Sequence, residues 1–247
     1  EHPDYTRTAT GVLSESSNTG TVKVGEMVTD QQRYDMMKAF QFGETTDIGM
    51  PGESPGILAS PDEWGGRQRY TTMFGQGYAV TQLQQVGMVA ALANGGVYQP
   101  PRLIDGWTKS DGSYEQAPQR EPVRALDPKV AETMITMMES TTADEAGTGY
   151  YFNVEGYRIA AKTGTAELFE GAQTVGTATT VAGVVPADNP MIAVSVILYR
   201  PRSGILSSES AGPLFQSVVG EAVKSLGIPV LARLGVVHRG GRRDLRF

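Results

Sequence analysis

The sequence predicts an α+β protein in which an antiparallel sheet is flanked by helices. Hydrophobic residues recur at helical spacing along 81–94 and again along 213–226. Between these segments the pattern changes to short runs rich in β-branched residues, which are typical of strands. The expected strands cover residues 157–166, 179–185 and 192–198. A compact turn over 186–190 separates the last two strands, so these two should pair antiparallel.

Local capping signals place the ends of the expected helices. Asp30 is the expected N-cap of the third helix, and Thr81 with Gln84 forms a capping box at the start of the fourth. Asp127 followed by Pro128 begins the fifth, because proline is favoured at the first helical position. The expected helices cover residues 6–13, 21–27, 30–40 and 81–94, a segment beginning at 128, and 213–226.

Two segments are expected to lie on the surface, and one helix face is expected in the core. Residues 43–78 are rich in glycine and proline and predict a long surface excursion. Residues 103–107, followed by a turn over 110–113, predict a hairpin. In the final helix, four apolar residues share one face, and we expect that face to pack on the sheet. These residues are Leu214, Val218, Ala222 and Leu226.

Composition predicts one domain with a hydrophobic core and a short tail of different character. The 247 residues are 40% hydrophobic with a net charge of −6, which argues against nucleic-acid binding. Residues 231–247 are basic, with five arginines against one aspartate. This tail has the charge to touch anionic lipid or nucleic acid, but a solvated, disordered end is the simpler expectation. We therefore expect a domain over 1–230 and a disordered tail over 231–247.

The chain contains no cysteine and only two histidines, His2 and His238, both near its ends. This composition excludes thiolate metal sites and a cysteine nucleophile, and it argues against a Ser-His-Asp triad or a histidine-based zinc site. We therefore expect no metal and no cofactor. If the domain performs acyl transfer, lysine, serine or carboxylate groups must move the protons.

The segment Lys162-Thr163-Gly164-Thr165 lies in the first expected strand and is the strongest candidate for chemistry. Because side chains alternate along a strand, Thr163 and Thr165 present two hydroxyls on one face, which suits an anion. Lys162 supplies a positive charge, and Gly164 lets a substrate backbone approach closely. A strand end with a solvated lysine and two solvated threonines is the alternative interpretation.

A second candidate is the triplet Ser16-Ser17-Asn18, which lies between two expected helices. By itself it is best explained as a polar loop whose side chains satisfy nearby backbone groups. Together with the later Lys-Thr-Gly, it forms an ordered pair of motifs that occurs in serine β-lactamases and penicillin-binding proteins.

The flanking segments resemble class B penicillin-binding proteins, with the division-specific type most similar. The resemblance covers about residues 5–230, and Gln82 stands where the family usually has proline. The segments that carry it are Gly75-Gln76-Gly77, Thr81-Gln82-Leu83-Gln84, the Ala-Ala-Leu-Ala-Asn-Gly-Gly run over 90–96, Gly147-Thr148-Gly149, 161–166 and 182–190.

The resemblance implies the transpeptidase fold shared by penicillin-binding proteins and serine β-lactamases. It also implies the activity of a peptidoglycan D,D-transpeptidase. A serine attacks the bond between two terminal D-alanines of a stem peptide, and an amine from a neighbouring stem resolves the acyl-enzyme. β-Lactams are similar to the D-Ala-D-Ala end and trap the serine. The implied partners are therefore stem peptides, β-lactams and other wall-synthesis or division proteins, with no nucleic acid.

The resemblance also assigns roles to the two motifs. Ser16 would relay a proton to the leaving nitrogen, and Asn18 would bind the amide carbonyl of the substrate. Lys162 would lie near Ser16 and keep the site positive. The hydroxyls of Thr163 and Thr165 would bind the substrate carboxylate. The backbone N–H of Thr165 would be one donor of the oxyanion hole.

No serine in the chain has a lysine three residues later. In the family the acylated serine belongs to a Ser-x-x-Lys motif that precedes Ser-x-Asn. We therefore expect the N-terminal part of the transpeptidase domain to be missing from this chain. The chain alone should then be inactive and unlabelled by penicillin. Two alternatives remain open, a nucleophile-less scaffold or sensor domain of a wall-synthesis complex, and a D,D-carboxypeptidase or β-lactamase relative in which water resolves the acyl-enzyme.

The family further implies a location on the extracytoplasmic face of the bacterial cell membrane. The expected anchor is one N-terminal helix that this chain does not contain. No run in the sequence approaches the ~20 apolar residues of a membrane span.

Overall fold

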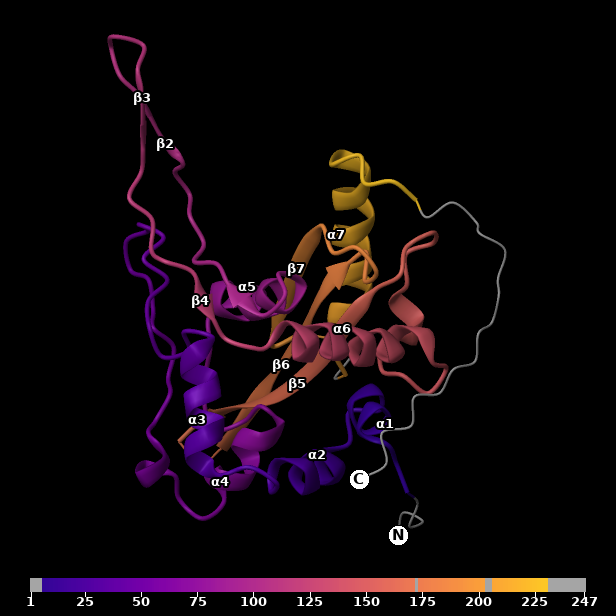
Figure 1. Ribbon diagram of the computed structural model, residues 1–247. Helices are drawn as coiled ribbons and strands as arrows, with labels where there is room; N and C mark the ends of the chain where they lie inside the picture. The colour runs from indigo at the N-terminus through magenta and orange to yellow at the C-terminus, as the bar shows by residue number, and fades with distance from the viewer. Residues whose placement is uncertain (1–5, 172, 203–205, 231–247) are drawn as a thin grey trace.

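The central sheet of the computed structural model is a three-stranded antiparallel meander (Figure 1). The structure describes residues 6–171, 173–202 and 206–230. The strands are β5 (Ala160–Glu170), β6 (Gln173–Val185) and β7 (Ile192–Tyr199), in the order β5-β6-β7. All three predicted strands are confirmed, although β5 begins and ends later and β6 begins earlier than predicted.

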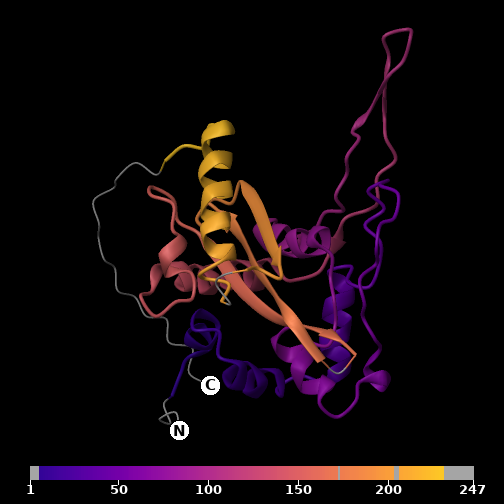
Figure 2. The ribbon, with the colours of Figure 1, turned by 180° about the vertical axis from the view of Figure 1, so that it is seen from behind.

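Helix α7 (Ala211–Ser225) covers one face of this sheet (Figure 2). The predicted buried face of this helix was wrong by one residue, because Leu214 and Val218 are 39% and 40% exposed. Both stripes of the helix are apolar, and docking onto the sheet selects the one that carries the aromatic ring of Phe215. The residues buried against the strands are Phe215, Val219 and Val223.

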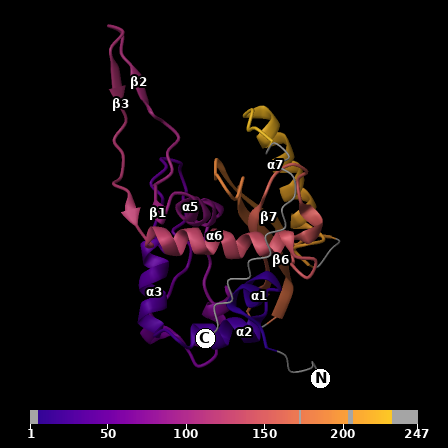
Figure 3. The same ribbon diagram turned by 45° about the vertical axis from the view of Figure 1, so that its right-hand side comes forward.

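Helices α5 (Gln82–Ala93) and α6 (Pro128–Ala143) cover the opposite face, with α6 running across it (Figure 3). The predicted starts of both helices are confirmed. The Thr81 side chain accepts a hydrogen bond from the N–H of Gln84, and Asp127 accepts one from Lys129. The core residues between these helices and the sheet are Val89, Leu92, Ile135, Met138, Ala160, Ala182 and Val184.

Three helices precede this core, α1 (Ala9–Ser14), α2 (Asn18–Gly25) and α3 (Asp30–Ala39). Helix α2 begins earlier than predicted, because Ser17 acts as its N-cap. The N-cap of α3 is Thr29 and not Asp30, since Thr29 forms a capping box with Gln32. Polar residues that flank a helix start therefore located these two helices only to within a few residues.

The glycine- and proline-rich excursion contains only short helices, η1 (Pro61–Glu63), α4 (Gln68–Thr71) and η2 (Thr72–Phe74). Its return to the core is held by Gln84, which is fully buried. The Gln84 amide donates to the carbonyls of Glu44 and Pro55 at 2.8 and 2.9 Å. A polar side chain is stable in this core because it satisfies backbone groups that water does not reach.

The predicted hairpin is confirmed as β2 (Gly106–Thr108) paired with β3 (Tyr114–Gln116), and it projects from the body of the molecule (Figures 1 and 3). It leaves and rejoins the body at a second small sheet of β1 (Val97–Tyr98) and β4 (Val123–Arg124). In the part of the chain that the structure describes, no helix has the length and hydropathy needed to cross a bilayer. The predicted tail over 231–247 lies outside the described residues.

Candidate active site

Strand β5 presents the Lys-Thr-Gly segment with alternating faces. Ala161 belongs to the core cluster under α7, whereas Ala160 belongs to the cluster against α5 and α6. Neighbouring residues of a strand point to opposite faces. The side chains of Thr163 and Thr165 therefore lie on the α7 side, and that of Lys162 lies on the side of the other helices.

The ammonium group of Lys162 joins the two candidate motifs. Its Nζ donates to Ser16 Oγ at 2.7 Å and to the backbone carbonyl of Thr163 at 2.9 Å. Ser16 and Lys162 are 146 residues apart in the sequence, so the tertiary fold alone brings them together. Burial lowers the pKa of Lys162 to about 8, because desolvation disfavours the charged form. The amine therefore still carries its proton in most molecules at neutral pH.

A tight connection between α1 and α2 presents Ser16. This residue has a φ of 55°, in the left-handed region that a residue with a side chain adopts at a cost. The connection is anchored before Ser16, where the carbonyl of Ser14 accepts from the N–H of Thr148 and its hydroxyl donates to the carbonyl of Ser140, both at 3.1 Å. It is anchored after Ser16 by the Ser17 cap of α2. These anchors hold the exposed Ser16 hydroxyl against the lysine of β5.

Asn18 lies in the first turn of α2 and is exposed. Within the described residues, its side-chain amide has no hydrogen-bond partner, so its donors and its acceptor remain open to a ligand. The middle residue of the triplet, Ser17, is instead occupied, because it accepts from the N–H of Gly20 at 3.2 Å. The first and third residues of Ser-x-Asn thus face outward, while the second maintains the helix.

The two hydroxyls of the β5 segment each meet a further hydroxyl that sequence reasoning had assigned no role. Thr163 Oγ1 donates to Thr148 Oγ1 at 2.8 Å, and Thr165 Oγ1 lies 2.6 Å from Ser207 Oγ. The sequence marked Thr148 only as part of a family-like Gly-Thr-Gly segment. Ser207 follows no motif, and no signal in the sequence distinguishes it from the neighbouring serines.

Strand β5 lies at one end of the sheet, so only one of its two edges pairs with another strand of that sheet. The other, open edge faces these groups. The carbonyl of Ala161 accepts from the hydroxyl of Thr141 at 2.5 Å, and that of Thr163 accepts from Lys162. Both carbonyls therefore point away from β6. In an antiparallel ladder, alternate residues direct their N–H and C=O groups to the same side. The N–H of Thr165 consequently points to the same open edge.

The structure gives a reason for glycine at position 164 that the sequence did not reveal. A Cβ placed on this residue would lie 2.7 Å from Thr180 Oγ1 on β6, which is closer than real Cβ contacts allow. The predicted reason was the close approach of a substrate backbone. Any larger residue here would therefore force the Thr180 side chain to move, whatever the substrate does.

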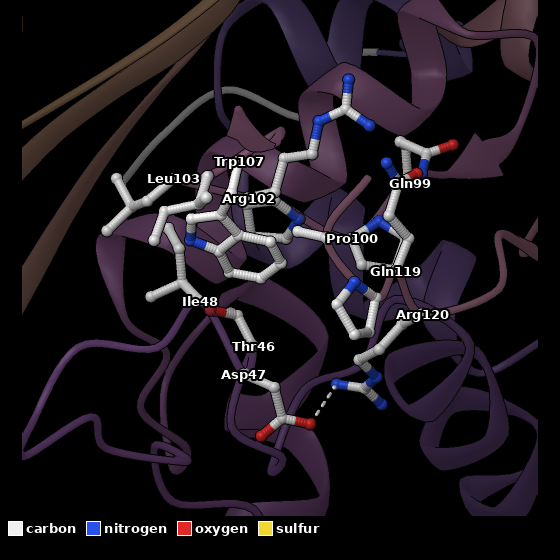
Figure 4. Close-up of a pocket in the computed structure, with 14 residues that line it drawn as sticks. Thr46, Asp47, Ile48, Gln99, Pro100, Arg102, Leu103, Trp107, Gln119 and Arg120 are labelled. Atoms are coloured by element: carbon white, nitrogen blue, oxygen red, sulfur yellow. Dashed lines mark ion pairs between the residues drawn. The ribbon is translucent and has the colours of Figure 1, made fainter. Parts of the chain in front are cut away.

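The pocket in Figure 4 lies elsewhere, at the base of the projecting hairpin. It has a volume of about 230 Å³ and is lined by residues of 46–48, 99–104 and 117–120, together with Trp107. Two of these residues, Arg120 and Asp47, form an ion pair at 3.4 Å. The pocket shares no residue with either motif.

Comparisons with known proteins show the family of the chain. The family described as "Penicillin binding protein transpeptidase domain" matches residues 1–220. Penicillin-binding protein PbpB of Mycobacterium tuberculosis is 34% identical over 245 residues, covering 93% of this chain and 36% of PbpB. Peptidoglycan D,D-transpeptidase FtsI of Escherichia coli is 31% identical over 224 residues, covering 90% of this chain and 36% of FtsI. The chain thus spans about a third of the length of these relatives.

Solved structures show the same fold. Penicillin-binding protein 3 of Mycobacterium tuberculosis, complexed with ampicillin, superposes with a TM-score of 0.87 at 33% identity, covering 96% of this chain and 55% of that one. A peptidoglycan synthetase of Bifidobacterium adolescentis gives a TM-score of 0.83 at 32% identity, covering 94% and 43%. The predicted fold is confirmed. The chain belongs to the transpeptidase domain family of class B penicillin-binding proteins.

Proposed function

We propose that this chain supplies the Ser-x-Asn and Lys-Thr-Gly parts of the active site of a peptidoglycan D,D-transpeptidase that works through an acyl-serine. The observation that carries the proposal is the 2.7 Å contact between Lys162 Nζ and Ser16 Oγ. A half-buried lysine that holds a serine hydroxyl across two distant motifs suits proton transfer to a leaving amine. Such a contact has no function in a polar loop or in a solvated strand end.

Each remaining group has a place in this reaction. Asn18, whose side chain is exposed, binds the amide carbonyl of the stem peptide. The hydroxyls of Thr163 and Thr165, with the charge of Lys162, bind its terminal carboxylate. The backbone N–H of Thr165 lies at the open edge of β5 and donates to the oxyanion of the tetrahedral intermediate. No metal or cofactor is needed for any of these steps.

The nucleophile is proposed to come from a Ser-x-x-Lys segment outside these 247 residues. No serine of the chain has a lysine three residues later, and the relatives PbpB and FtsI are almost three times as long as the matched part. The 247 residues alone are then inactive.

The proposed ligands and location follow from the same family. Relatives in this fold were solved with ampicillin and with aztreonam, which supports β-lactams as ligands and D-Ala-D-Ala stem peptides as substrates. The likeness to FtsI supports division proteins as partners. We place the domain on the extracytoplasmic face of the bacterial membrane, anchored by a helix outside this chain.

The test is covalent labelling with a fluorescent penicillin, followed by mass mapping of the labelled peptide. We expect the full-length protein to be labelled at the serine of a Ser-x-x-Lys motif that precedes Glu1, and the 247 residues alone to stay unlabelled. Label on any residue of this chain would contradict the proposed nucleophile. A folded full-length protein that takes no label would instead support a scaffold or sensor domain. Rapid hydrolysis of the ester between the label and the serine would identify a carboxypeptidase or β-lactamase.

A further inference from the structure

Ser207 is a buried serine just before α7 that contacts the Lys-Thr-Gly strand in three ways. It is 3% exposed. Its Oγ donates to the carbonyl oxygen of Gly164 at 2.5 Å and lies 2.6 Å from Thr165 Oγ1. Its backbone N–H donates to Thr165 Oγ1 at 3.3 Å. All three contacts go to two consecutive residues of β5.

Counting hydroxyl protons assigns a direction to the shortest side-chain contact. A serine hydroxyl has one proton, and that of Ser207 is already donated to the Gly164 carbonyl. The Thr165 hydroxyl must therefore be the donor toward Ser207. Without a ligand, Ser207 holds the one proton that Thr165 has to offer to an anion. It also fixes Thr165 Oγ1 through its own backbone N–H.

The contact with Gly164 acts on the other donor of Thr165. The carbonyl of Gly164 and the N–H of Thr165 belong to one peptide unit, which is planar and trans, so the two groups point in opposite directions. The carbonyl also accepts from Thr180 Oγ1 of β6 at 3.3 Å. The shorter bond from Ser207 adds to this restraint and so helps to fix the direction of the N–H at the open edge. Donation to the carbonyl also polarises the amide and strengthens its N–H as a donor.

Thr165 needs such support because its side chain is exposed. An exposed threonine on a strand is free to exchange between rotamers, and ordering it on binding costs conformational entropy. Thr163, by comparison, is held by Thr148. Ser207 gives Thr165 the corresponding restraint, from a buried position that a ligand does not displace.

We propose that Ser207 is a positioning residue that holds the side-chain oxygen of Thr165 in place and directs the backbone N–H of Thr165 toward the substrate. The inference rests on the proposed function and identifies a residue that this function did not include. When a carboxylate binds, the Thr165 proton rotates from Ser207 Oγ to the anion, while the Ser207 N–H keeps Thr165 Oγ1 in place. The peptide N–H stays directed at the position of the oxyanion.

The experiment uses the full-length enzyme and measures ampicillin affinity and the acylation rate constant separately by rapid kinetics. We expect Ser207→Ala to slow acylation by about threefold to tenfold, the range for loss of one net hydrogen bond. Ampicillin affinity should stay nearly unchanged, because the variant keeps the backbone N–H that holds Thr165 Oγ1. The matched control is Ser208→Ala, which removes the neighbouring hydroxyl and should leave both values unchanged. If Ser207→Ala does not fold, Ser207→Cys keeps nearly the same volume while weakening the hydrogen bonds.

A double-mutant cycle separates positioning from packing. In a Thr165→Val background no hydroxyl remains to be held, and Ser207→Ala should still slow acylation by a similar factor, because the contact with the Gly164 carbonyl acts through the peptide N–H. A loss of affinity in both backgrounds with no loss of acylation rate overturns the proposal, because Ser207 would then act only by packing. Wild-type behaviour of Ser207→Ala overturns it too. If the wild type itself is not acylated, the proposed function fails and not this inference alone.

Discussion

The two halves of the candidate site are built in opposite ways. The Lys-Thr-Gly half lies on β5, whose residues pair with β6 along the whole strand. The Ser-x-Asn half lies on a connection between two short helices, where Ser16 and Asn18 are both exposed. A strand in a sheet fixes side chains through its backbone ladder. The connection instead depends on a few single contacts, of which the Lys162 to Ser16 hydrogen bond is the one that reaches the other half.

This difference indicates where the geometry of the site is most sensitive to change. Substitutions on β5 act against a rigid support, so they should change chemistry more than position. Substitutions in the connection act on a strained backbone, so they should change position as well. Lys162 belongs to both cases, because its backbone is in the strand and its side chain holds the connection.

The largest effect is expected for Lys162→Met in the full-length enzyme. It removes the charge at the site and the contact that joins the two halves, so acylation by a β-lactam should fall by about 10² to 10⁴-fold, the range for loss of an acid–base group. Stopped-flow acylation measures this. Lys23→Met, which removes an exposed lysine of α2, is the control. A similar fall in the acylation rate of both variants would mean that the lost net charge, and not the lost contact between the two halves, is responsible.

A smaller effect should separate chemistry from backbone strain in the connection. Both Ser16→Ala and Ser16→Gly remove the hydroxyl and should slow acylation by about a hundredfold. Glycine tolerates the φ of 55°, so Ser16→Gly should unfold in urea with a free energy about 1 kcal/mol higher than that of Ser16→Ala. Equal unfolding free energies for the two variants would show that the left-handed conformation at this position is not costly.

The smallest effect concerns pH. Burial lowers the pKa of Lys162 to about 8, so the fraction of molecules with a protonated amine falls as the pH rises through that value. The affinity for a carboxylate-bearing β-lactam should therefore be constant below the pKa and fall above it toward the affinity of Lys162→Met. Lys162→Met should give a flat profile over the same range. A wild-type profile that stays flat up to pH 10 would show that the charge of Lys162 does not contribute to binding.

The sequence predicted the fold and the two motifs but not the residues that support them. Capping boxes and strand patterns are local, so Thr81, Asp127 and the three strands were found. The buried face of α7 was missed because the helix has two apolar stripes. Packing on the sheet decides whether the stripe with Leu214 or the stripe with Phe215 is buried. Thr148 and Ser207 meet the motif through tertiary contacts across 15 and 42 residues. Local patterns contain no signal for such pairs.

The long separation between Ser16 and Lys162 also has a consequence for the order of folding. The β5-β6-β7 meander closes through neighbouring segments, whereas their contact must close a loop of 146 residues. Loop-closure entropy delays contacts between distant parts of a chain. We therefore expect the sheet to form early during refolding and the connection between α1 and α2 to dock late. Recovery of penicillin labelling in a refolding full-length enzyme would then time the last step of folding and not the first.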